Sequence, residues 1–115
     1  MGFQWDLEKD AANQAKHLIG FRQAAEIFRG FRLIREDTRR DYGERRFIAL
    51  GEYDNEVLRV VYTLRDGDVR IISAWKASRH DRKAYATARQ ARPIWQSRRH
   101  AARRAAEQHF QGVDR

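Results

Sequence analysis

The stretch from Val69 to Tyr85 concentrates the side chains of this chain that could bind an anion. Its first half alternates like a β-strand. One face carries Val69, Ile71, Ser73 and Trp75, and the other carries Arg70, Ile72, Ala74 and Lys76. Ser78 is a suitable N-cap for a helix that opens with Arg79, His80, Arg82 and Lys83. Cations gathered in so small a volume repel one another unless acids or an anionic ligand balance them. The pattern predicts a polyanion site, and a solvated basic face is the alternative.

The net charge of +8 comes from the same half of the chain. Residues 76–115 hold eleven Lys or Arg against three Asp or Glu, whereas residues 1–75 hold thirteen of each. An excess of positive charge concentrated in one part of the chain favours binding to a polyanion or to an acidic protein partner. The length of 115 residues predicts one domain, and a hydrophobic fraction of 42% is enough for a modest core.

Cysteine is absent, which excludes disulfides, thiolate metal sites and a cysteine nucleophile, and which fits a reducing compartment. The sequence offers no tight set of His, Asp and Glu ligands, so we expect no metal and no other cofactor. No apolar run approaches the roughly 18 residues that a bilayer requires, and no signal peptide is recognisable. We therefore expect a soluble, cytoplasmic protein without a membrane partner.

Two helices are predicted near the N-terminus, after a short apolar lead-in or strand at Phe3 and Trp5. The first runs from Leu7 to His17 and is capped by Asp6. Its apolar stripe, typical of a packed helix face, consists of Leu7, Ala11, Ala15 and Leu18. Lys16 and His17 lie at its C-terminal end. The helix dipole stabilises cations there, so their presence does not require a functional role. The second helix shows the spacing of a buried face at Phe21, Ala24, Ala25 and Phe28, and Gly30 is expected to end it in the left-handed conformation.

Four strands are predicted next, over residues 31–36, 46–53, 57–64 and 69–76. Asp66-Gly67 is a strong signal for a two-residue hairpin turn. Helical character returns after Ser78, Arg92-Pro93 interrupts it, and a last helix is expected over residues 94–110. The fold class is therefore α+β, with two N-terminal helices, an antiparallel four-stranded sheet and C-terminal helices.

Four segments of the sequence resemble the BrnT toxin family. They are Phe3-x-Trp5-Asp6-x-x-Lys9-x-x-x-Asn13-x-x-Lys16-His17, then Asp41-Tyr42-Gly43-Glu44-x-Arg46-Phe47-Ile48-Ala49-Leu50-Gly51, then Val61-Tyr62-Thr63 with Arg70-Ile71-Ile72-Ser73-Ala74, and finally Ala77-Ser78-Arg79-x-x-Arg82-x-x-Tyr85. Their order and spacing also match. Three positions depart from the family pattern: Leu18 replaces a usual glycine, Trp75 a common arginine, and Asp81 a usual glutamate.

The resemblance implies the toxin of a type II toxin–antitoxin pair, with a RelE-like ribonuclease fold. It implies cleavage of RNA, arrest of translation and growth, and neutralisation by a BrnA-type antitoxin through which alone operator DNA is bound. A homodimer and a heterotetramer with the antitoxin are both compatible with it. On this basis we expect residues 1–85 to form the toxin domain. Residues 86–115, which the resemblance does not cover, are expected to form a basic helical extension of the same domain.

RNA cleavage requires a base for the 2′-hydroxyl, an acid for the 5′-oxygen and positive charge for the crowded phosphate. His17 is the best candidate for proton transfer because its ordinary pKa lies nearest neutrality. Lys16 would assist it, and Tyr85 would stack on a base or donate a proton. The candidates for stabilising the phosphorane are Arg46, Arg70 and Lys76. The candidates for binding RNA phosphates are Arg79, Arg82, Arg98 and Arg99.

Structural readings compete with these roles. His17 is also explained as a helix-end cation, Arg46 and Arg70 as solvated strand residues, and Tyr85 as part of the core. The chain as a whole could be a non-catalytic module that binds nucleic acid or a protein through its basic C-terminal helix. A neighbouring reading frame with a DNA-binding pattern favours the toxin, and an isolated gene favours the module.

Overall fold

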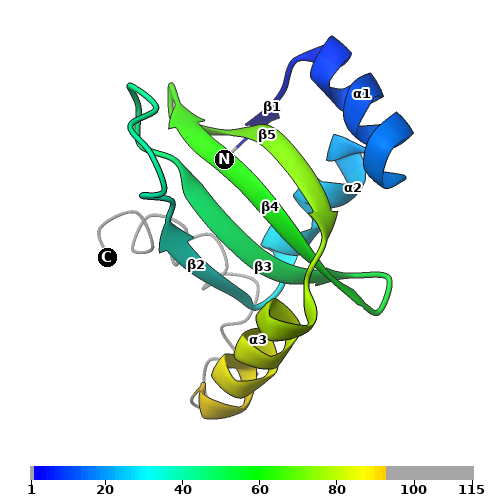
Figure 1. The fold of residues 1–115 in the computed structure, drawn as a ribbon, viewed down its shortest axis with the longest axis vertical. Coiled ribbons are helices and arrows are strands. Elements are labelled where there is room, and N and C mark those ends of the chain that lie inside the picture. Colours follow the sequence, from blue (N-terminus) through cyan, green and yellow to red (C-terminus); the bar gives the residue numbers. More distant parts are fainter. Residues whose placement is uncertain (1, 93–115) are drawn as a thin grey trace.

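The computed structural model describes residues 2–92, which form three α-helices, a short 3₁₀ helix and one five-stranded sheet (Figure 1). In chain order the elements are β1 (Phe3–Gln4), α1 (Leu7–His17), α2 (Phe21–Ala25), η1 (Glu26–Arg29), β2 (Arg32–Glu36), β3 (Phe47–Tyr53), β4 (Glu56–Arg65), β5 (Asp68–Lys76) and α3 (Arg79–Ala91). The predicted α+β class is confirmed. Residues 94–110, predicted as a last helix, lie outside the described residues, as do Arg98 and Arg99.

The sheet has the strand order β1-β5-β4-β3-β2. Strands β2 to β5 form the predicted antiparallel meander. The prediction of four strands was wrong, because Phe3 and Gln4 pair in parallel with Val69 and Arg70 and add a fifth strand. The apolar N-terminus thus extends the sheet beside the first residues of β5, a long-range pairing that the local pattern did not specify.

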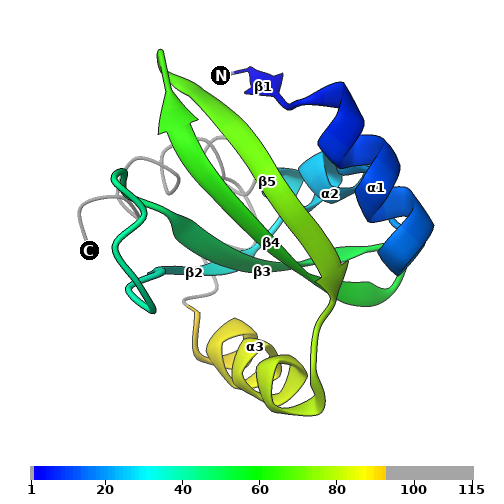
Figure 2. The same cartoon turned by 45° about the horizontal axis from the view of Figure 1, so that its top comes forward.

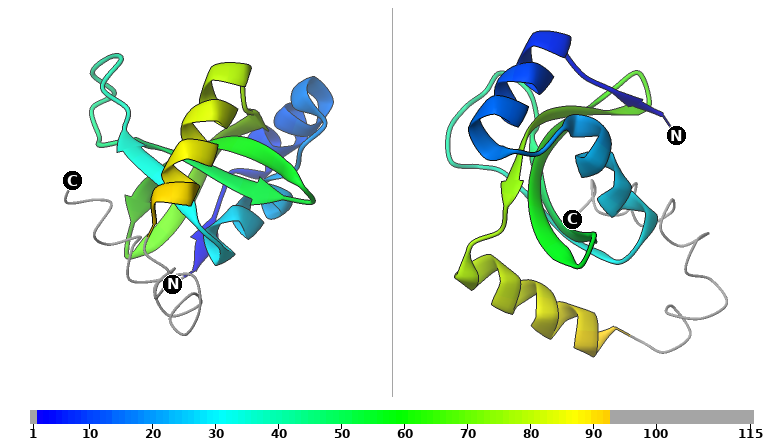
Figure 3. Two further views of the ribbon diagram at one scale, coloured as in Figure 1. Left: turned by 90° about the horizontal axis from the view of Figure 1, so that it is seen from below. Right: turned by 90° about the vertical axis from the view of Figure 1, so that its right-hand side faces the viewer.

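The two faces of the sheet are covered by different helices. Helix α2 lies on one face and α3 lies on the other, near one end of the strands, while α1 lies along the edge strand β5 (Figures 2 and 3). We call the first the core face, because its buried side chains pack against α2 and η1 in the main core. We call the second the α3 face, where Tyr85 and Ala77 pack with Leu50 in a smaller cluster.

A β-bulge in β5 changes which side chains share a face. Val61 pairs with Ser73, but the next residue of β4, Tyr62, pairs with Ile71, so Ile72 is an extra residue. Downstream of it the alternation is reversed, and the predicted grouping of Ser73 and Trp75 with Ile71 was wrong. Ala74 is buried in the core beside Ile71 instead. Trp75 takes a register position opposite Arg59, on the α3 face.

Helix α1 begins and ends as predicted, but it packs through a different side. Asp6 caps it by accepting from the backbone N–H groups of Glu8 (2.8 Å) and Lys9 (3.1 Å). The predicted apolar stripe faces solvent, since Leu7 is 77% exposed, Leu18 is 84% exposed, and the alanines between them are exposed as well. The buried residue of the helix is Asn13.

The turn predictions had mixed outcomes. Asp66 and Gly67 both have positive φ (54° and 82°), as a type I′ hairpin requires. Gly30 has an extended backbone (φ −118°), so the prediction that it ends a helix in the left-handed conformation was wrong. The second predicted helix is α2, which tightens into η1 before Gly30.

Helix α3 starts at the predicted N-cap, where the Ser78 hydroxyl accepts from the backbone N–H of Asp81 (3.1 Å). It continues past Tyr85 to Ala91, so the proposed boundary between residues 85 and 86 falls inside one helix. Among the described residues, no helix is long and apolar enough to cross a membrane.

Candidate functional site

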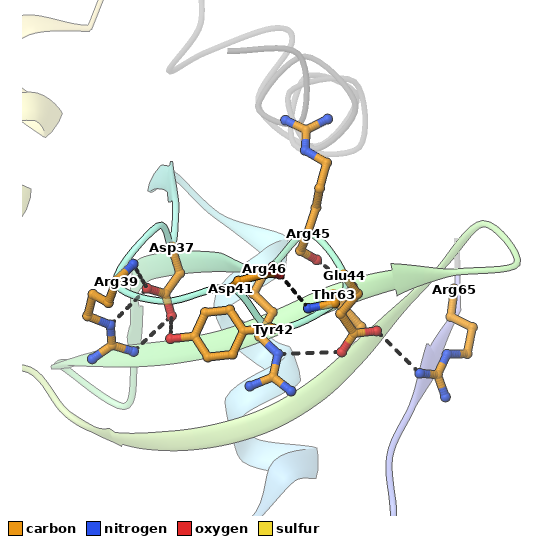
Figure 4. A network of polar contacts seen from close by, with 10 residues as sticks. Asp37, Arg39, Asp41, Tyr42, Glu44, Arg45, Arg46, Thr63 and Arg65 are labelled. Carbon is orange, nitrogen blue, oxygen red and sulfur yellow. Dashed lines mark hydrogen bonds and ion pairs between the residues drawn. The ribbon is translucent and has the colours of Figure 1, made fainter.

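Two groups of polar side chains lie on the α3 face, and the first is built on the charged loop before β3. We call it the Arg46 cluster: Tyr42, Glu44, Arg46, Arg65 and Arg70. The Arg46 guanidinium lies 4.2 Å from the centre of the Tyr42 ring and 3.4 Å from a carboxylate oxygen of Glu44 (Figure 4). Glu44 also pairs with Arg65 at 3.5 Å. The loop therefore holds two arginines around one carboxylate.

The Tyr42 ring is itself fixed by the buried carboxylate of Asp37. The Tyr42 hydroxyl donates to Asp37 Oδ2 (2.9 Å), while Arg39 donates to both carboxylate oxygens at 2.8 Å (Figure 4). The Arg39 hydrogen bonds hold the pKa of the Asp37 carboxyl well below its ordinary value, and Tyr42 adds to this effect. Through Tyr42 and Glu44, the family-like segment Asp41-Tyr42-Gly43-Glu44 thus holds the Arg46 side chain in position.

Arg70 joins this group through strand register. It pairs with Thr63, whose hydroxyl donates to the carbonyl of Arg45 (2.6 Å), immediately before Arg46. The Arg70 guanidinium donates to the side-chain oxygen of Gln4 (3.0 Å). The structure therefore brings the predicted residues Arg46 and Arg70 to the same end of the α3 face.

The second group is a stack of four side chains from four elements, and we call it the Trp75 stack. The His17 ring, at the end of α1, lies 5.6 Å from the Trp75 ring, with an angle of 36° between the planes. The Arg59 guanidinium lies 5.8 Å from the Trp75 ring centre. Arg59 donates to Asp81 Oδ2 of α3 at 2.8 Å, and this pair is largely buried. The indole thereby connects the His17 imidazole to a buried ion pair.

Asn13 fixes α1 to β5 beside the stack. Its side-chain amide donates to the carbonyls of Ile19 (2.9 Å) and Ala74 (2.7 Å) and accepts from the N–H of Ala74 (3.2 Å). Since His17 lies one helical turn after Asn13, and Trp75 follows Ala74, this contact sets the approach of the imidazole to the indole.

The two groups lie at different places along the strands. Trp75 pairs with Arg59 and Arg70 pairs with Thr63, a separation of four residues along β4. At the rise of an extended strand this corresponds to about 13 Å. The structure therefore does not place His17 beside Arg46 and Arg70, and the predicted single catalytic group is divided in two.

Other predicted residues lie elsewhere. Lys76 pairs in register with Leu58 on the core face, because the bulge reversed the alternation, and its ammonium lies 3.4 Å from a Glu56 carboxylate oxygen. Lys16 is exposed on α1. Arg79 and Arg82 are exposed in the first turn of α3, where Arg82 donates to the carbonyl of Ala77 (3.0 Å).

Tyr85 is only 4% exposed, and its hydroxyl donates to the Phe31 carbonyl and to Glu52, both at 3.2 Å. Burial raises the pKa of this hydroxyl. A ring packed in this way offers no surface to a nucleotide base, so the geometry favours the alternative that Tyr85 belongs to the core.

Sequence reasoning missed three residues that position the candidates. Arg59 looked like any outward strand residue, and only the strand pairing places it against Trp75. Tyr42 and Asn13 lay in the family-like segments, which was the one available signal of their importance. Within residues 2–92, no three His, Cys, Asp or Glu side chains lie close enough to hold a metal ion.

These features define a class: a small, basic α+β domain with several arginines along one face of its sheet and a helix histidine packed against a tryptophan of that face. Comparison with protein families is more specific. Residues 5–81 match the family model described as the ribonuclease toxin, BrnT, of type II toxin–antitoxin systems. The chain belongs to this family, which confirms the resemblance seen in the sequence. Membership implies an antitoxin partner and an RNA target. No curated protein matches the chain.

Proposed function

We propose that this chain is itself an active endoribonuclease toxin, which cleaves RNA, thereby inhibits translation and growth, and is neutralised by a BrnA-type antitoxin. Family membership supports the class of activity. The observation that carries the proposal for this chain is the Trp75 stack, which holds His17 beside the buried Arg59–Asp81 pair. It gives a proton-transfer group a fixed position against an indole that is itself held by a buried ion pair.

The proposed reaction is internal transesterification of RNA. A base removes the proton of a 2′-hydroxyl, the 2′-oxygen bonds to the adjacent phosphorus, and the bond from phosphorus to the 5′-oxygen breaks. The departing 5′-oxygen takes up a proton, leaving a 2′,3′-cyclic phosphate and a 5′-hydroxyl. We assign the first proton transfer to His17 and the second to Lys16, its exposed neighbour. The scheme needs neither a metal ion nor a water molecule.

The RNA strand would lie along the α3 face, between the two groups. Arg46, Arg65 and Arg70 would bind phosphates at one end, with Glu44 and Tyr42 holding the first of them in place. Arg79 and Arg82, exposed at the start of α3, would bind phosphates beyond His17. In this arrangement Arg46 and Arg70 bind the substrate, and Lys16 is the cation at the reacting phosphate.

The test is induced expression of the chain alone in a bacterial host, followed by growth and by total RNA on a gel. The expected result is growth arrest with RNA fragmentation, which the neighbouring antitoxin gene suppresses. The purified chain should cleave RNA in the presence of EDTA. His17→Ala should abolish cleavage while the protein remains folded, whereas His80→Ala, a matched change of an exposed histidine in α3, should have no effect.

Two results would contradict the proposal. Normal growth and intact RNA, from soluble and folded protein, would favour the non-catalytic binding module. Cleavage that survives His17→Ala would remove the Trp75 stack from the reaction and direct attention to the Arg46 cluster.

A further inference from the structure

Glu44 is the acid of the Arg46 cluster, and its carboxylate is held only by long contacts. One of its oxygens lies 3.4 Å from Arg46 Nε, and the other lies 3.5 Å from a guanidinium nitrogen of Arg65. Strong ion pairs of this kind measure about 2.7–2.9 Å, and the Arg59–Asp81 pair of the same face measures 2.8 Å. The Glu44 side chain is also 33% exposed. Its two oxygens can therefore accept further hydrogen bonds from the solvent side.

A carboxylate at this place is unsuited to an RNA phosphate, because the two carry like charges. The arginines around Glu44 bind phosphates in the proposed arrangement, whereas Glu44 itself can only accept from a hydrogen-bond donor. The donors that RNA offers are its 2′-hydroxyls and the N–H groups of its bases. Phosphate and sugar contacts position a strand, and contacts to base edges read its sequence. Glu44 is therefore the member of the cluster that is suited to reading a base.

Tyr42 and Arg46 provide a surface on which that base can stack. Figure 4 shows the Arg46 guanidinium between the Tyr42 ring and the Glu44 carboxylate. The guanidinium lies 4.2 Å from the ring centre, and the Tyr42 hydroxyl is fixed by its hydrogen bond to the buried Asp37. Unpaired RNA bases stack on aromatic rings and on guanidinium planes. A base stacked on this pair would bring its edge to the Glu44 carboxylate.

The chemistry of a carboxylate favours guanine over the other three bases. An ionised carboxylate accepts through two neighbouring oxygens and donates nothing. The Watson–Crick edge of guanine carries two neighbouring donors, its N1–H and its 2-amino group, which match these two oxygens. Adenine and cytosine offer one amino group beside an acceptor nitrogen, and uracil offers one N–H between two carbonyls. Each of these three bases would place an acceptor against a carboxylate oxygen, which leaves both without a partner.

We propose that Glu44 reads a guanine base of the RNA strand, stacked on Tyr42 and Arg46, while Arg65 and Arg70 bind neighbouring phosphates. This inference rests on the proposed function, because it assigns a subsite to the RNA strand placed along the α3 face.

The guanine subsite does not lie at the bond that is cut. The Arg46 cluster and the Trp75 stack are about 13 Å apart along β4. Successive nucleotides of one strand in a duplex rise by only about 3.4 Å. The guanine preference should therefore appear at a position displaced from the cleaved bond, and always by the same number of nucleotides.

Binding to RNA that cannot be cleaved tests the base preference without any reaction. The probe is a short, labelled 2′-O-methyl oligouridine with one variable base, and its affinity for the full chain is measured by fluorescence anisotropy at constant salt. Guanine should bind at least about tenfold more tightly than adenine, cytosine or uracil. Inosine retains the N1–H of guanine and lacks its 2-amino group, so it should lose about tenfold as well.

Glu44→Gln should change the preference from guanine to adenine. A carboxamide offers one acceptor and one donor, which match the 6-amino group and the N1 of adenine. Glu36→Gln is the matched control: Glu36 is a carboxylate that pairs with Arg45 of the same loop at 3.0 Å, and its replacement should leave the guanine preference unchanged.

The outcomes separate this inference from the proposed function. Equal affinity for the four bases, or a guanine preference that survives Glu44→Gln, would overturn the guanine subsite. Guanine binding by a chain that cleaves no RNA would support the subsite and contradict the nuclease. If the chain does cleave RNA, sequencing of the fragment ends should show guanine enriched at one displaced position, and adenine there for Glu44→Gln. Cleavage without such enrichment would contradict the subsite alone.

Discussion

Asn13 makes three hydrogen bonds, two of which attach α1 to β5, and its replacement by alanine tests how the site is positioned. The residue is 7% exposed, and its partners are the Ile19 carbonyl and both backbone groups of Ala74. Asn13→Ala removes all three bonds and leaves the backbone groups of a mostly buried segment without these partners. The change is local, because alanine is fully compatible with the helix.

The expected loss of stability can be estimated from the contacts. Each hydrogen bond contributes about 1 kcal/mol, so the free energy of unfolding should fall by about 3 kcal/mol. A domain of this size is typically stable by about 5–15 kcal/mol, so the variant should still fold. The thermal midpoint should fall by about 10 °C. Gln14→Ala is the matched control: the Gln14 side chain donates to Asp10 in a solvent-exposed hydrogen bond, so the change should cost less than about 0.5 kcal/mol.

The Asn13→Ala variant should cleave RNA more slowly than its loss of stability alone explains. Without this attachment the end of α1 is free to move, and the His17 ring loses its fixed contact with Trp75. We expect RNA cleavage to fall at least about tenfold at a temperature where the variant is fully folded. Thermal denaturation followed by circular dichroism, and cleavage of a defined RNA at low temperature, provide the two measurements.

Each measurement can refute a different step. A midpoint within about 2 °C of wild type would mean that the three hydrogen bonds contribute almost nothing. A large loss of stability with unchanged cleavage would mean that the attachment of α1 does not position His17, or that His17 does not act.

Changes at three other positions test separate contacts. Trp75→Leu should lower the cleavage rate about tenfold with a smaller effect on substrate affinity, while Trp75→Phe retains a ring for His17 and should be milder; equal effects of the two variants would argue against ring stacking. Gly51→Ala should destabilise the protein by about 1–3 kcal/mol in urea unfolding, since the new β-carbon would lie 2.7 Å from the Ile27 β-carbon. Asp37→Asn should be less stable than wild type by about 2 kcal/mol at neutral pH. Because folding depresses the pKa of Asp37, this difference should be complete above pH about 4 and should close as the pH falls further; a constant difference would contradict the assignment.

Much of the local structure could be predicted from the sequence. The cap at Asp6, the start of α3 after Ser78 and the turn at Asp66-Gly67 depend on neighbouring residues alone, and all three were predicted correctly. The pairing of Phe3 with Val69 depends on residues far apart in the chain, so a short strand at Phe3 was one of the predictions but its place in the sheet was not.

The candidate site was harder to predict because it depends on tertiary structure. The bulge at Ile72 has no signal in the local pattern, yet it moves Trp75 onto the α3 face and separates Lys76 from Arg70. The stripe of α1 has the pattern of a packed face, but the helix is held through Asn13 on another side. Residue type and spacing indicated which side chains were candidates, and the strand register decided which of them meet.

The hydrogen bonds of Asn13 have a consequence for aggregation. Beyond Arg70, β5 is not paired with β1, so it forms an open edge of the sheet among the described strands. At Ala74 the Asn13 amide accepts from the N–H and donates to the carbonyl, as the backbone of a neighbouring strand would. The side chain therefore occupies hydrogen-bonding groups that could otherwise recruit a strand from another molecule. Helix α1 therefore covers this edge of the sheet, and detaching it would expose β5 to pairing with a strand of another molecule.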